Sequence, residues 1–482
     1  MSAQSVAIVG AGMGGLAAGV YGRLAGLDTT IFEMHDKPGG LCTAWTRQGY
    51  TFDGCIHHLA GCLPGTPTYR MWEDLGAMPR EVLFPAELTQ VETPEGKRLT
   101  VPTDLDRLEA HLLGLAPGDR RLIRRYIRAL RIFTRFDLFD AMTGSWREWA
   151  RLLRHAPTAI RWGRLTMRTF AARFRDPFLR QAMATIQYDW TDTPVILHLN
   201  ILAGSAVRRY GFPAGGSLRF AQAIADRYLS LGGEIHYRAK VEAILVERGR
   251  AVGVRLGDGT EYRADAVISN ATPHATLFNL LGGKYMDEKL RAAFARPQDE
   301  MVMGVHVSFG LARDLSQEPH AMVLWLPKPV ELADRARDRL DLELFGFDPS
   351  LAPPEKGVLK VLLDTKWRYW VELARDRSRY RAEKERLANT VLRLLEPRFP
   401  GIMGQVEVWD VATPLTTERY TGVGPGFASS PRWGAMMLSR PMTVPGVKGL
   451  QIVGQSAGGA GIPGCATMGR NAVRTLMAAG RG

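Results

Sequence analysis

The sequence has few cysteines and lacks long hydrophobic runs, and each shortage excludes a class of protein. Its four cysteines, spread over 482 residues, form neither a CxxC pair nor a zinc-binding spacing, so neither a disulfide scaffold nor a metal site is expected. No stretch is apolar for long enough to cross a bilayer. No basic residue precedes the apolar run that starts at Val6, which argues against a signal peptide. These absences predict a cytoplasmic protein.

Acidic residues are scarce in one segment. The stretch from Arg120 to Arg180 contains sixteen arginines and four acidic residues, while the net charge of the whole chain is +13. Aromatic and aliphatic residues alternate with these arginines at helical spacings, among them Phe133, Phe136, Leu138, Trp146, Leu153 and Trp162. A basic amphipathic helix that carries tryptophan suits an anionic membrane surface. Residues 120–180 therefore predict peripheral attachment to the inner face of a membrane.

This basic segment has two other interpretations. A helical cap, whose arginines are solvated or paired with acids elsewhere, explains the composition equally well. Binding to nucleic acid is disfavoured, because no recognised nucleic-acid module accompanies the charge.

The overall composition is that of a folded protein. Hydrophobic residues make up 46% of the chain and charged residues 23%, a balance typical of globular domains. Since 482 residues exceed what one ordinary core accommodates, we expect two interleaved domains with a large buried volume between them.

The chain begins with the pattern of a nucleotide-binding βαβ unit. A strand is predicted over Ser5–Val9, a helix up to about Ala25, and a second strand over Thr29–Phe32. Glu33 follows that second strand, 23 residues after the first glycine of the turn, which is close to the spacing of an acid that binds ribose. The glycines of the turn fit the pattern GxGxxG, with one addition, and are Gly10, Gly12, Gly14 and Gly15.

Each part of this unit has a physical task. Glycines let the backbone approach a pyrophosphate, whose charge is stabilised by the amides and the positive dipole of the helix N-terminus. Glu33 would accept hydrogen bonds from ribose hydroxyls. Because strand, glycines, helix and terminal acid occur together, the sequence predicts a bound dinucleotide.

A second glycine pair follows the acid and distinguishes FAD from NAD. Gly39 and Gly40 stand in the run from Pro38 to Thr43. The stretch from Val6 to Thr43 resembles the amino-terminal signature of the flavoprotein superfamily that contains amine oxidases, phytoene desaturases, carotenoid isomerases and retinol saturases. In that superfamily the second glycine pair wraps the flavin side of FAD. The resemblance implies non-covalently bound FAD, with contacts from Met34, Gly39, Gly40, Leu41 and Thr43.

The middle of the chain adds a predicted β-meander. Strands are expected over Val241–Val246, Val252–Leu256 and Glu261–Arg263, with a turn at Asp258 and Gly259. This pattern looks like the superfamily's meander against the adenine end of FAD, which would bring the backbone of Val241 to the cofactor. The alternative is a hairpin without a cofactor role.

The carboxyl terminus carries the strongest resemblance. A strand over Gly449–Val453 is followed by a glycine-rich run and by a helix to about Ala478. The letters GAGIPG in this run closely resemble the carboxyl-terminal motif of phytoene desaturases. A helix N-terminus that faces the flavin would stabilise the negative charge of its reduced form. The resemblance adds five residues to the cofactor site: Gly454, Gln455, Gly461, Ile462 and Pro463.

Two further stretches resemble the carotenoid isomerase and retinol saturase branch. One runs from Tyr50 to His57 and the other from Thr413 to Thr416. The first resemblance implies that His57 approaches the flavin or the substrate as a catalytic residue. The alternative is a histidine that is satisfied by structural contacts alone.

These resemblances predict an α/β fold, with a Rossmann-like FAD-binding domain of the glutathione-reductase type and an interleaved α+β substrate domain. The FAD-binding domain is discontinuous and comprises residues 1–69, 207–281 and 431–482. The substrate domain comprises residues 70–206 and 282–430.

The implied function is that of an FAD-dependent oxidoreductase. Its expected substrate is a hydrophobic isoprenoid or polyene, whose carbon–carbon bonds it desaturates, saturates or isomerises, with NAD(P)H as a candidate reductant. FAD itself carries the redox chemistry. Two alternatives stay open: a flavin amine oxidase, and a non-catalytic prenyl-lipid-binding protein on the same fold. The sequence leaves the oligomeric state open.

Overall fold

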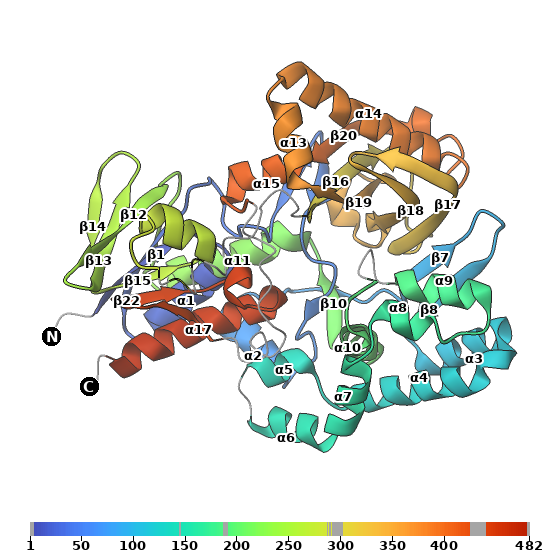
Figure 1. The fold of residues 1–482 in the computed structure, drawn as a ribbon, viewed down its shortest axis with the longest axis horizontal. Helices are drawn as coiled ribbons and strands as arrows, with labels where there is room; N and C mark the ends of the chain where they lie inside the picture. Colours follow the sequence, from blue (N-terminus) through green and yellow to red (C-terminus); the bar gives the residue numbers. More distant parts are fainter. Residues whose placement is uncertain are drawn as a thin grey trace.

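A computed structural model describes residues 4–143, 146–186, 191–286, 288, 291, 302–424 and 440–479. Of the third stretch assigned to the FAD-binding domain, residues 431–439 therefore lie outside the described part. The described residues form two large sheets with helices packed on them (Figure 1).

The first sheet is mainly parallel and has nine strands. Its central order is β11-β2-β1-β15-β22-β13-β12, and β14 and β21 are added at β13 and β22. Strands from all three stretches assigned to the FAD-binding domain share this sheet. The bounds are β1 Ser5–Val9, β2 Asp28–Phe32, β11 Glu234–His236, β12 Val241–Glu247, β13 Arg250–Leu256, β14 Glu261–Arg263, β15 Ala266–Ser269, β21 Met442–Val444 and β22 Val447–Ile452.

Both faces of this sheet are buried, as is usual for parallel sheets. Val6 and Ile8 of β1 belong to one apolar cluster, together with the buried sides of three helices, while Ala7 and Val9 belong to another. The three helices are α1 (Met13–Leu24), α11 (Gly216–Ser230) and α17 (Gly461–Ala479). The predicted α/β, Rossmann-like class is confirmed.

The second sheet has seven strands, in the order β20-β16-β19-β18-β17-β7-β8. Helices α13 (Trp367–Ala374) and α14 (Arg377–Leu395) pack on it through Trp370 and Leu387. The strand bounds are β7 Glu87–Glu92, β8 Arg98–Pro102, β16 Val302–Leu311, β17 Ala321–Leu332, β18 Arg335–Leu344, β19 Gly357–Lys366 and β20 Val406–Ala412.

Between the two sheets lie a hairpin and three short strands. The hairpin consists of β3 (Ala44–Arg47) and β4 (Tyr50–Asp53), and β10 (Tyr210–Pro213) lies between β5 (Leu59–Ala60) and β6 (Val82–Leu83). Helices α2 (Pro67–Asp74) and α15 (Pro414–Thr421) complete this part. The division into domains stays a prediction.

The arginine-rich segment folds into several short helices instead of one long amphipathic helix. Phe133, Phe136, Leu138 and Trp162 are buried in a core shared with β7, β8 and β17, so most of its aromatic residues serve packing. Trp146 and Leu153 are exposed. The helices of this region are α3 Leu105–Leu115, α4 Arg120–Phe133, α5 Leu138–Met142, α6 Trp146–Arg154, α7 Ala156–Gly163, α8 Met167–Ala171, α9 Pro177–Thr185 and α10 Val195–Ala206.

Most predicted elements lie where the sequence places them. β1 and β14 have the predicted bounds, and α1 ends one residue before the predicted end. The strand expected from Gly449 begins earlier, at Val447, because β21 pairs with Val447 and β13 pairs with Lys448. In the described part of the chain, every helix is too short or too polar to cross a membrane.

Candidate active site

The GxGxxG turn joins β1 to α1, and its glycines are required by contact distances. At Gly10 the backbone has φ +89°, which favours glycine. A Cβ on Gly15 would lie 2.0 Å from the carbonyl oxygen of Gly10. Gly12 is the N-cap of α1 and has no side-chain cap, and a Cβ on Gly14 would meet Asn270. The turn therefore presents backbone amides to whatever lies before α1.

Glu33 follows β2 and reaches back to this turn. Its carboxylate accepts hydrogen bonds from the backbone N–H of Ala11, at 2.6 Å, and of His35, at 2.8 Å. The residue is 5% exposed, and burial raises the pKa of its carboxyl. Glu33 also borders the main cavity. A buried carboxylate with remaining acceptor positions is suited to bind ribose hydroxyls.

The second glycine pair packs directly on the first turn. Gly39 donates its N–H to the carbonyl oxygen of Ala11 at 2.8 Å and forms a bridge with Gly12. Gly39 and Gly40 have φ +109° and +60°. Leu41 and Thr43 continue from this pair along the wall of the cavity.

The carboxyl-terminal motif closes the same site from the other side. Gly454 has φ +107° and Gly461, at the start of α17, has φ +59°. Gln455, Gly461 and Ile462 border the cavity, while Pro463 is buried in the first turn of the helix.

One large cavity connects these motifs to the second half of the molecule. Its volume is about 1020 Å³, at the upper end of the range for small-molecule sites. Helix α5 lies over the carboxyl-terminal motif, since a Cβ on Gly461 would be 3.9 Å from the ring of Phe139. The apolar wall away from the glycine turns comes from α5, α10, β16 and β19 and includes Leu138, Phe139, Met142, Leu197, Ile201, Met303, Leu362 and Leu363.

His57 borders this cavity and is held from behind. Its Nδ1 atom contacts Oε1 of Glu343 on β18, whose other carboxylate oxygen lies 2.5 Å from Nζ of Lys360 on β19. Burial raises the pKa of the Glu343 carboxyl, but the stronger opposing effect of His57 and Lys360 holds it well below its usual range.

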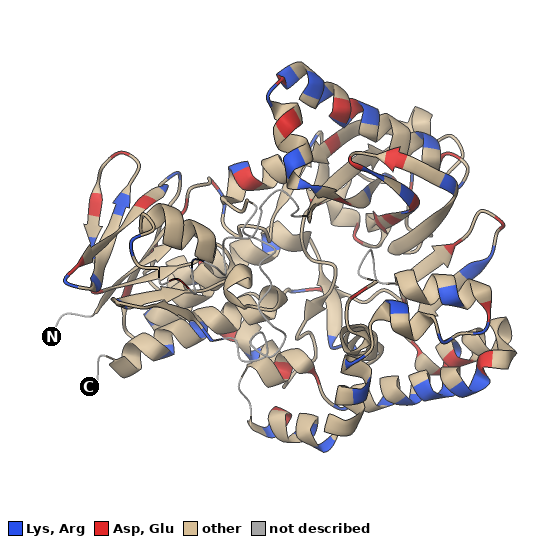
Figure 2. Cartoon of the chain, viewed as in Figure 1, with Lys and Arg blue, Asp and Glu red and all other residues tan. Residues whose placement is uncertain are grey.

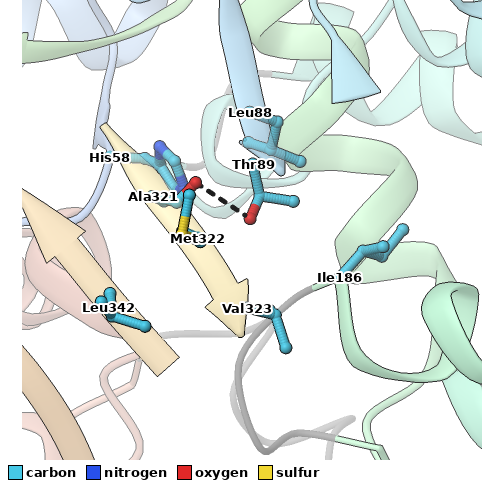
Figure 3. Close-up of a pocket in the computed structure, with 8 residues that line it drawn as sticks. All are labelled: His58, Leu88, Thr89, Ile186, Ala321, Met322, Val323 and Leu342. Carbon is cyan, nitrogen blue, oxygen red and sulfur yellow. Dashed lines mark hydrogen bonds between the residues drawn. The ribbon is translucent and has the colours of Figure 1, made fainter. Parts of the chain in front are cut away.

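Three other histidines near His57 are uncharged at neutral pH. Burial lowers the pKa of His58 and His306 to about 3 and that of His320 to about 4. His58 borders both the large cavity and a second one of about 10 Å³, the space of a single water molecule. Figure 3 shows His58 at this small cavity with Leu88, Met322 and Leu342, so the site ends in an apolar, uncharged wall.

Comparison with known proteins decides the family. A family model described as flavin containing amine oxidoreductase matches residues 13–477. The chain belongs to this family. It is 27% identical to the phytoene desaturase (lycopene-forming) of Pseudescherichia vulneris, with 96% of each chain covered. It is 25% identical to the chloroplastic prolycopene isomerase of Arabidopsis thaliana, over 93% of this chain and 78% of that protein.

Solved structures with low sequence identity share the fold. An oxidoreductase from Methanosarcina mazei superposes with a TM-score of 0.63 at 20% identity, covering 98% of this chain and all of that one. A triple mutant of putrescine oxidase superposes with a TM-score of 0.61 at 13% identity, covering 99% of both chains. These structures show the fold alone, while the family match and the curated relatives show that the protein is an FAD-dependent oxidoreductase, as the sequence predicts.

The residues present in this flavin oxidoreductase fit FAD. Glu33, Gly40 and the start of α17 border one cavity, and the GxGxxG turn lies directly behind them through the contacts Ala11–Glu33 and Gly12–Gly39. A Cβ on Gly40 would fall 3.3 Å from Cα of Gly12, so a side chain there would narrow the cradle. The individual cofactor contacts stay predictions.

Nine predicted contact residues do not border the cavity, namely Gly10, Gly12, Gly14, Gly15, Met34, Gly39, Val241, Gly454 and Pro463. Val241 is buried at the start of β12, in the same apolar cluster as Phe32, and does not border the cavity. Met34 follows Glu33, and its sulfur faces Gly422. Neither position excludes a backbone contact with the cofactor, which is the kind expected for Val241.

Sequence reasoning missed several residues that build the site of this oxidoreductase. Asn270 lies within 4 Å of where a Cβ would stand on Gly10, Gly12, Gly14 or Gly454. The sequence feature that could have revealed Asn270 is its position directly after the parallel strand β15. Glu343 and Lys360 gave no signal, because β18 has five other charged residues and β19 has two others, and no local pattern distinguishes these two. Phe139 and Met142 were read as part of a surface segment, yet they line the cavity.

Proposed function

We propose that this FAD-dependent oxidoreductase acts on carbon–carbon bonds of a polyene isoprenoid, by desaturation, saturation or isomerisation. The observation that carries the proposal is the single cavity that runs from Glu33 and Gly40 to the apolar wall of α5 and α10. An uncharged hydrocarbon chain gains free energy by leaving water for such a wall, at about 25 cal/mol per Å² of buried apolar surface. The relatives support this class, since they are named for phytoene and prolycopene.

The chain's own residues bind the cofactor and exclude water, while bound FAD supplies hydride exchange. Glu33 and the glycine turns would hold the adenosine and pyrophosphate part. The N-terminal turn of α17 would lie at the flavin, where its dipole stabilises negative charge. Phe139 and Met142 cover that turn and keep water from it.

The first experiment is an absorbance spectrum of the purified protein, before and after anaerobic mixing with phytoene or prolycopene in vesicles and, separately, with NAD(P)H. A flavin spectrum bleached by a polyene supports desaturation. Bleaching by NAD(P)H alone supports saturation or an isomerase that uses reduced flavin. A purified protein without flavin, which also fails to bind added FAD, contradicts the proposal.

FAD is proposed to be non-covalent. Cys465 in α17 is buried, with its thiol directed to the carbonyl oxygen of Gly459, and it does not border the cavity. Flavin should therefore be released by denaturation and pass through a filter that retains the chain. Flavin that stays with the chain would point to Cys55, which does border the cavity.

The amine oxidase alternative is tested in the same cuvette. A structural neighbour is a putrescine oxidase, and putrescine is dicationic at neutral pH, so its cavity must stabilise charge. The wall formed by α5 and α10 offers apolar side chains and Asn200 instead, and the acidic residues Asp341, Asp364 and Asp410 border the cavity from the second sheet. Bleaching by putrescine, with no effect of either polyene, would replace the polyene proposal with amine oxidation.

We further propose that the protein binds an anionic membrane surface through an α6–α7 patch, defined as Trp146, Leu153 and Ile160. These side chains are 74%, 67% and 54% exposed. Arginines accompany them on the same two helices, and Figure 2 shows positive charge along α4 and α6. Helix α6 packs on α5, which lines the cavity, so a lipid-soluble substrate would enter beside the patch.

A further inference from the structure

His57, Glu343 and Lys360 form a connected group across one loop and two strands. His57 lies four residues after β4, and Glu343 and Lys360 face each other as a directly paired couple in β18 and β19. The Nζ atom of Lys360 also donates a hydrogen bond to the carbonyl oxygen of Asp53, at 2.7 Å. The group therefore fixes the loop that carries His57 against the second sheet.

Burial makes this arrangement costly as a purely structural device. The side chains of Glu343 and Lys360 are 7% and 2% exposed, and the desolvation of such an ion pair can exceed its Coulombic gain. Apolar residues of similar volume would hold β18 and β19 together as well. The pair does have one consequence that apolar residues lack, because it keeps an ionised carboxylate at Nδ1 of His57.

We propose that Glu343 and Lys360 are positioning residues that fix the ring of His57, so that its Nε2 atom exchanges a proton with the substrate. The proposal rests on the proposed function and deepens it. A carboxylate at Nδ1 selects the tautomer with a proton on Nδ1, which leaves Nε2 as the basic nitrogen. Lys360 keeps Glu343 ionised and occupies its second oxygen.

The proton balance follows from the chemistry of a carbon–carbon bond. In the oxidative direction one carbon loses a hydride to FAD, its neighbour loses a proton to Nε2, and the electron pair of that second C–H bond forms the double bond. Nε2 then releases the proton to water. Saturation runs the same steps in reverse, with the proton returned from Nε2 to carbon.

Electrostatic neighbours of His57 do not compete for this role. His58, His306 and His320 are uncharged at neutral pH because of their burial. Charged groups in contact with His57 include Glu343, and Lys360 lies behind that carboxylate.

The test uses four variants of the flavin-loaded protein: His57→Gln, His57→Gly, Glu343→Gln and Lys360→Met. His111→Gln is the matched control, because that histidine lies in α3 and accepts a hydrogen bond from Thr100, away from the cavity. Flavin content and kcat and KM for phytoene and prolycopene in vesicles are measured for each variant. Nitrogen-15 NMR of histidine-labelled protein reports which ring nitrogen carries the proton.

We expect His57→Gln and Glu343→Gln to lower kcat by about 10²-fold, a usual share for positioned proton transfer, with KM and flavin content unchanged. Added imidazole should restore part of the rate of His57→Gly, which a purely structural histidine would not allow. In wild type the His57 proton should be on Nδ1, and Glu343→Gln should remove this preference.

Unchanged kcat in His57→Gln overturns the inference, and so does a proton found on Nε2 in the wild-type ring. These outcomes differ from failure of the proposed function. If the wild-type protein converts neither polyene, the proposed function fails, while the NMR measurement still decides whether Glu343 orients His57.

Discussion

The carboxylate of Glu33 accepts a hydrogen bond from the backbone N–H of Ala11 across 2.6 Å. This contact joins the end of β2 to the glycine turn between β1 and α1. Strands β1 and β2 are adjacent in the sheet. The acid that the sequence assigns to ribose is thus fixed at the same point as the amides assigned to pyrophosphate.

Glu33→Gln should weaken FAD binding by about 1–3 kcal/mol, because a charged acceptor is lost from a buried site. The measurement is the dissociation constant of FAD, by fluorescence quenching of the apoprotein. Glu242→Gln, on the exposed side of β12, is the control and should bind FAD as wild type does. Equal affinity of both variants would contradict the site assignment.

The same residue predicts a pH dependence of the flavin-free protein. Burial raises the pKa of Glu33 in the folded state, so its contribution to stability is present below the unfolded pKa and is lost as pH rises through the folded one. As pH rises above about 4, the pKa of a glutamate in an unfolded chain, wild-type apoprotein should therefore lose stability relative to Glu33→Gln. Urea unfolding measures the free energy of unfolding of both proteins at each pH. A difference between the two that stays constant with pH would refute this prediction.

Two glycine substitutions should change the stability of the protein in opposite directions. Gly15→Ala should destabilise the protein by about 1–3 kcal/mol, since its Cβ would lie 2.0 Å from the carbonyl oxygen of Gly10. Gly114→Ala, in α3 with nothing within 4 Å of the new Cβ, should stabilise it by about 0.5–1 kcal/mol. Thermal unfolding measures both, and a stable Gly15→Ala protein that retains flavin would contradict the close approach.

Acid should destabilise the protein through its buried histidines. Burial lowers the pKa of His198 to about 3, and Nε2 of this ring lies 2.6 Å from the hydroxyl of Tyr126. A depressed folded-state pKa means that stability is present above the unfolded value of about 6.5 and is lost as pH falls. We expect the unfolding free energy to decline from pH 7 to 5, and less so in His198→Gln. An equal decline would assign the effect to other groups.

Removing the α6–α7 patch should release the protein from membranes. Replacing Trp146, Leu153 and Ile160 by serine should abolish co-sedimentation with vesicles that contain anionic lipid, while flavin content stays unchanged, because all three side chains are exposed. High salt should release the wild-type protein. The control is Leu229→Ser, because Leu229 is also an exposed leucine but lies on α11. Failure of wild type to bind at low salt would remove the membrane proposal.

Local patterns in the sequence were sufficient to predict the flavin-binding fold. Gly15 and Gly10 are separated by one turn of chain, and Glu33 by one helix and one strand, so their meeting follows from a single βαβ unit. The same reasoning located β12 to β14 and α17. It placed the aromatic residues of the arginine-rich segment at a surface, although most of them are buried. Periodicity reveals that a helix has an apolar face but not what covers that face.

The sequence by itself thus determined the flavin-binding fold, because its signals are short-range turns, caps and strand periods. Only the tertiary structure decided the rest of the site. His57 meets Glu343 across 286 positions of chain, and Phe139 of α5 meets Gly461 of α17. Such contacts arise when separate elements pack to bury apolar surface, and a lone charged or aromatic residue in a strand or helix carries no local record of its distant partner.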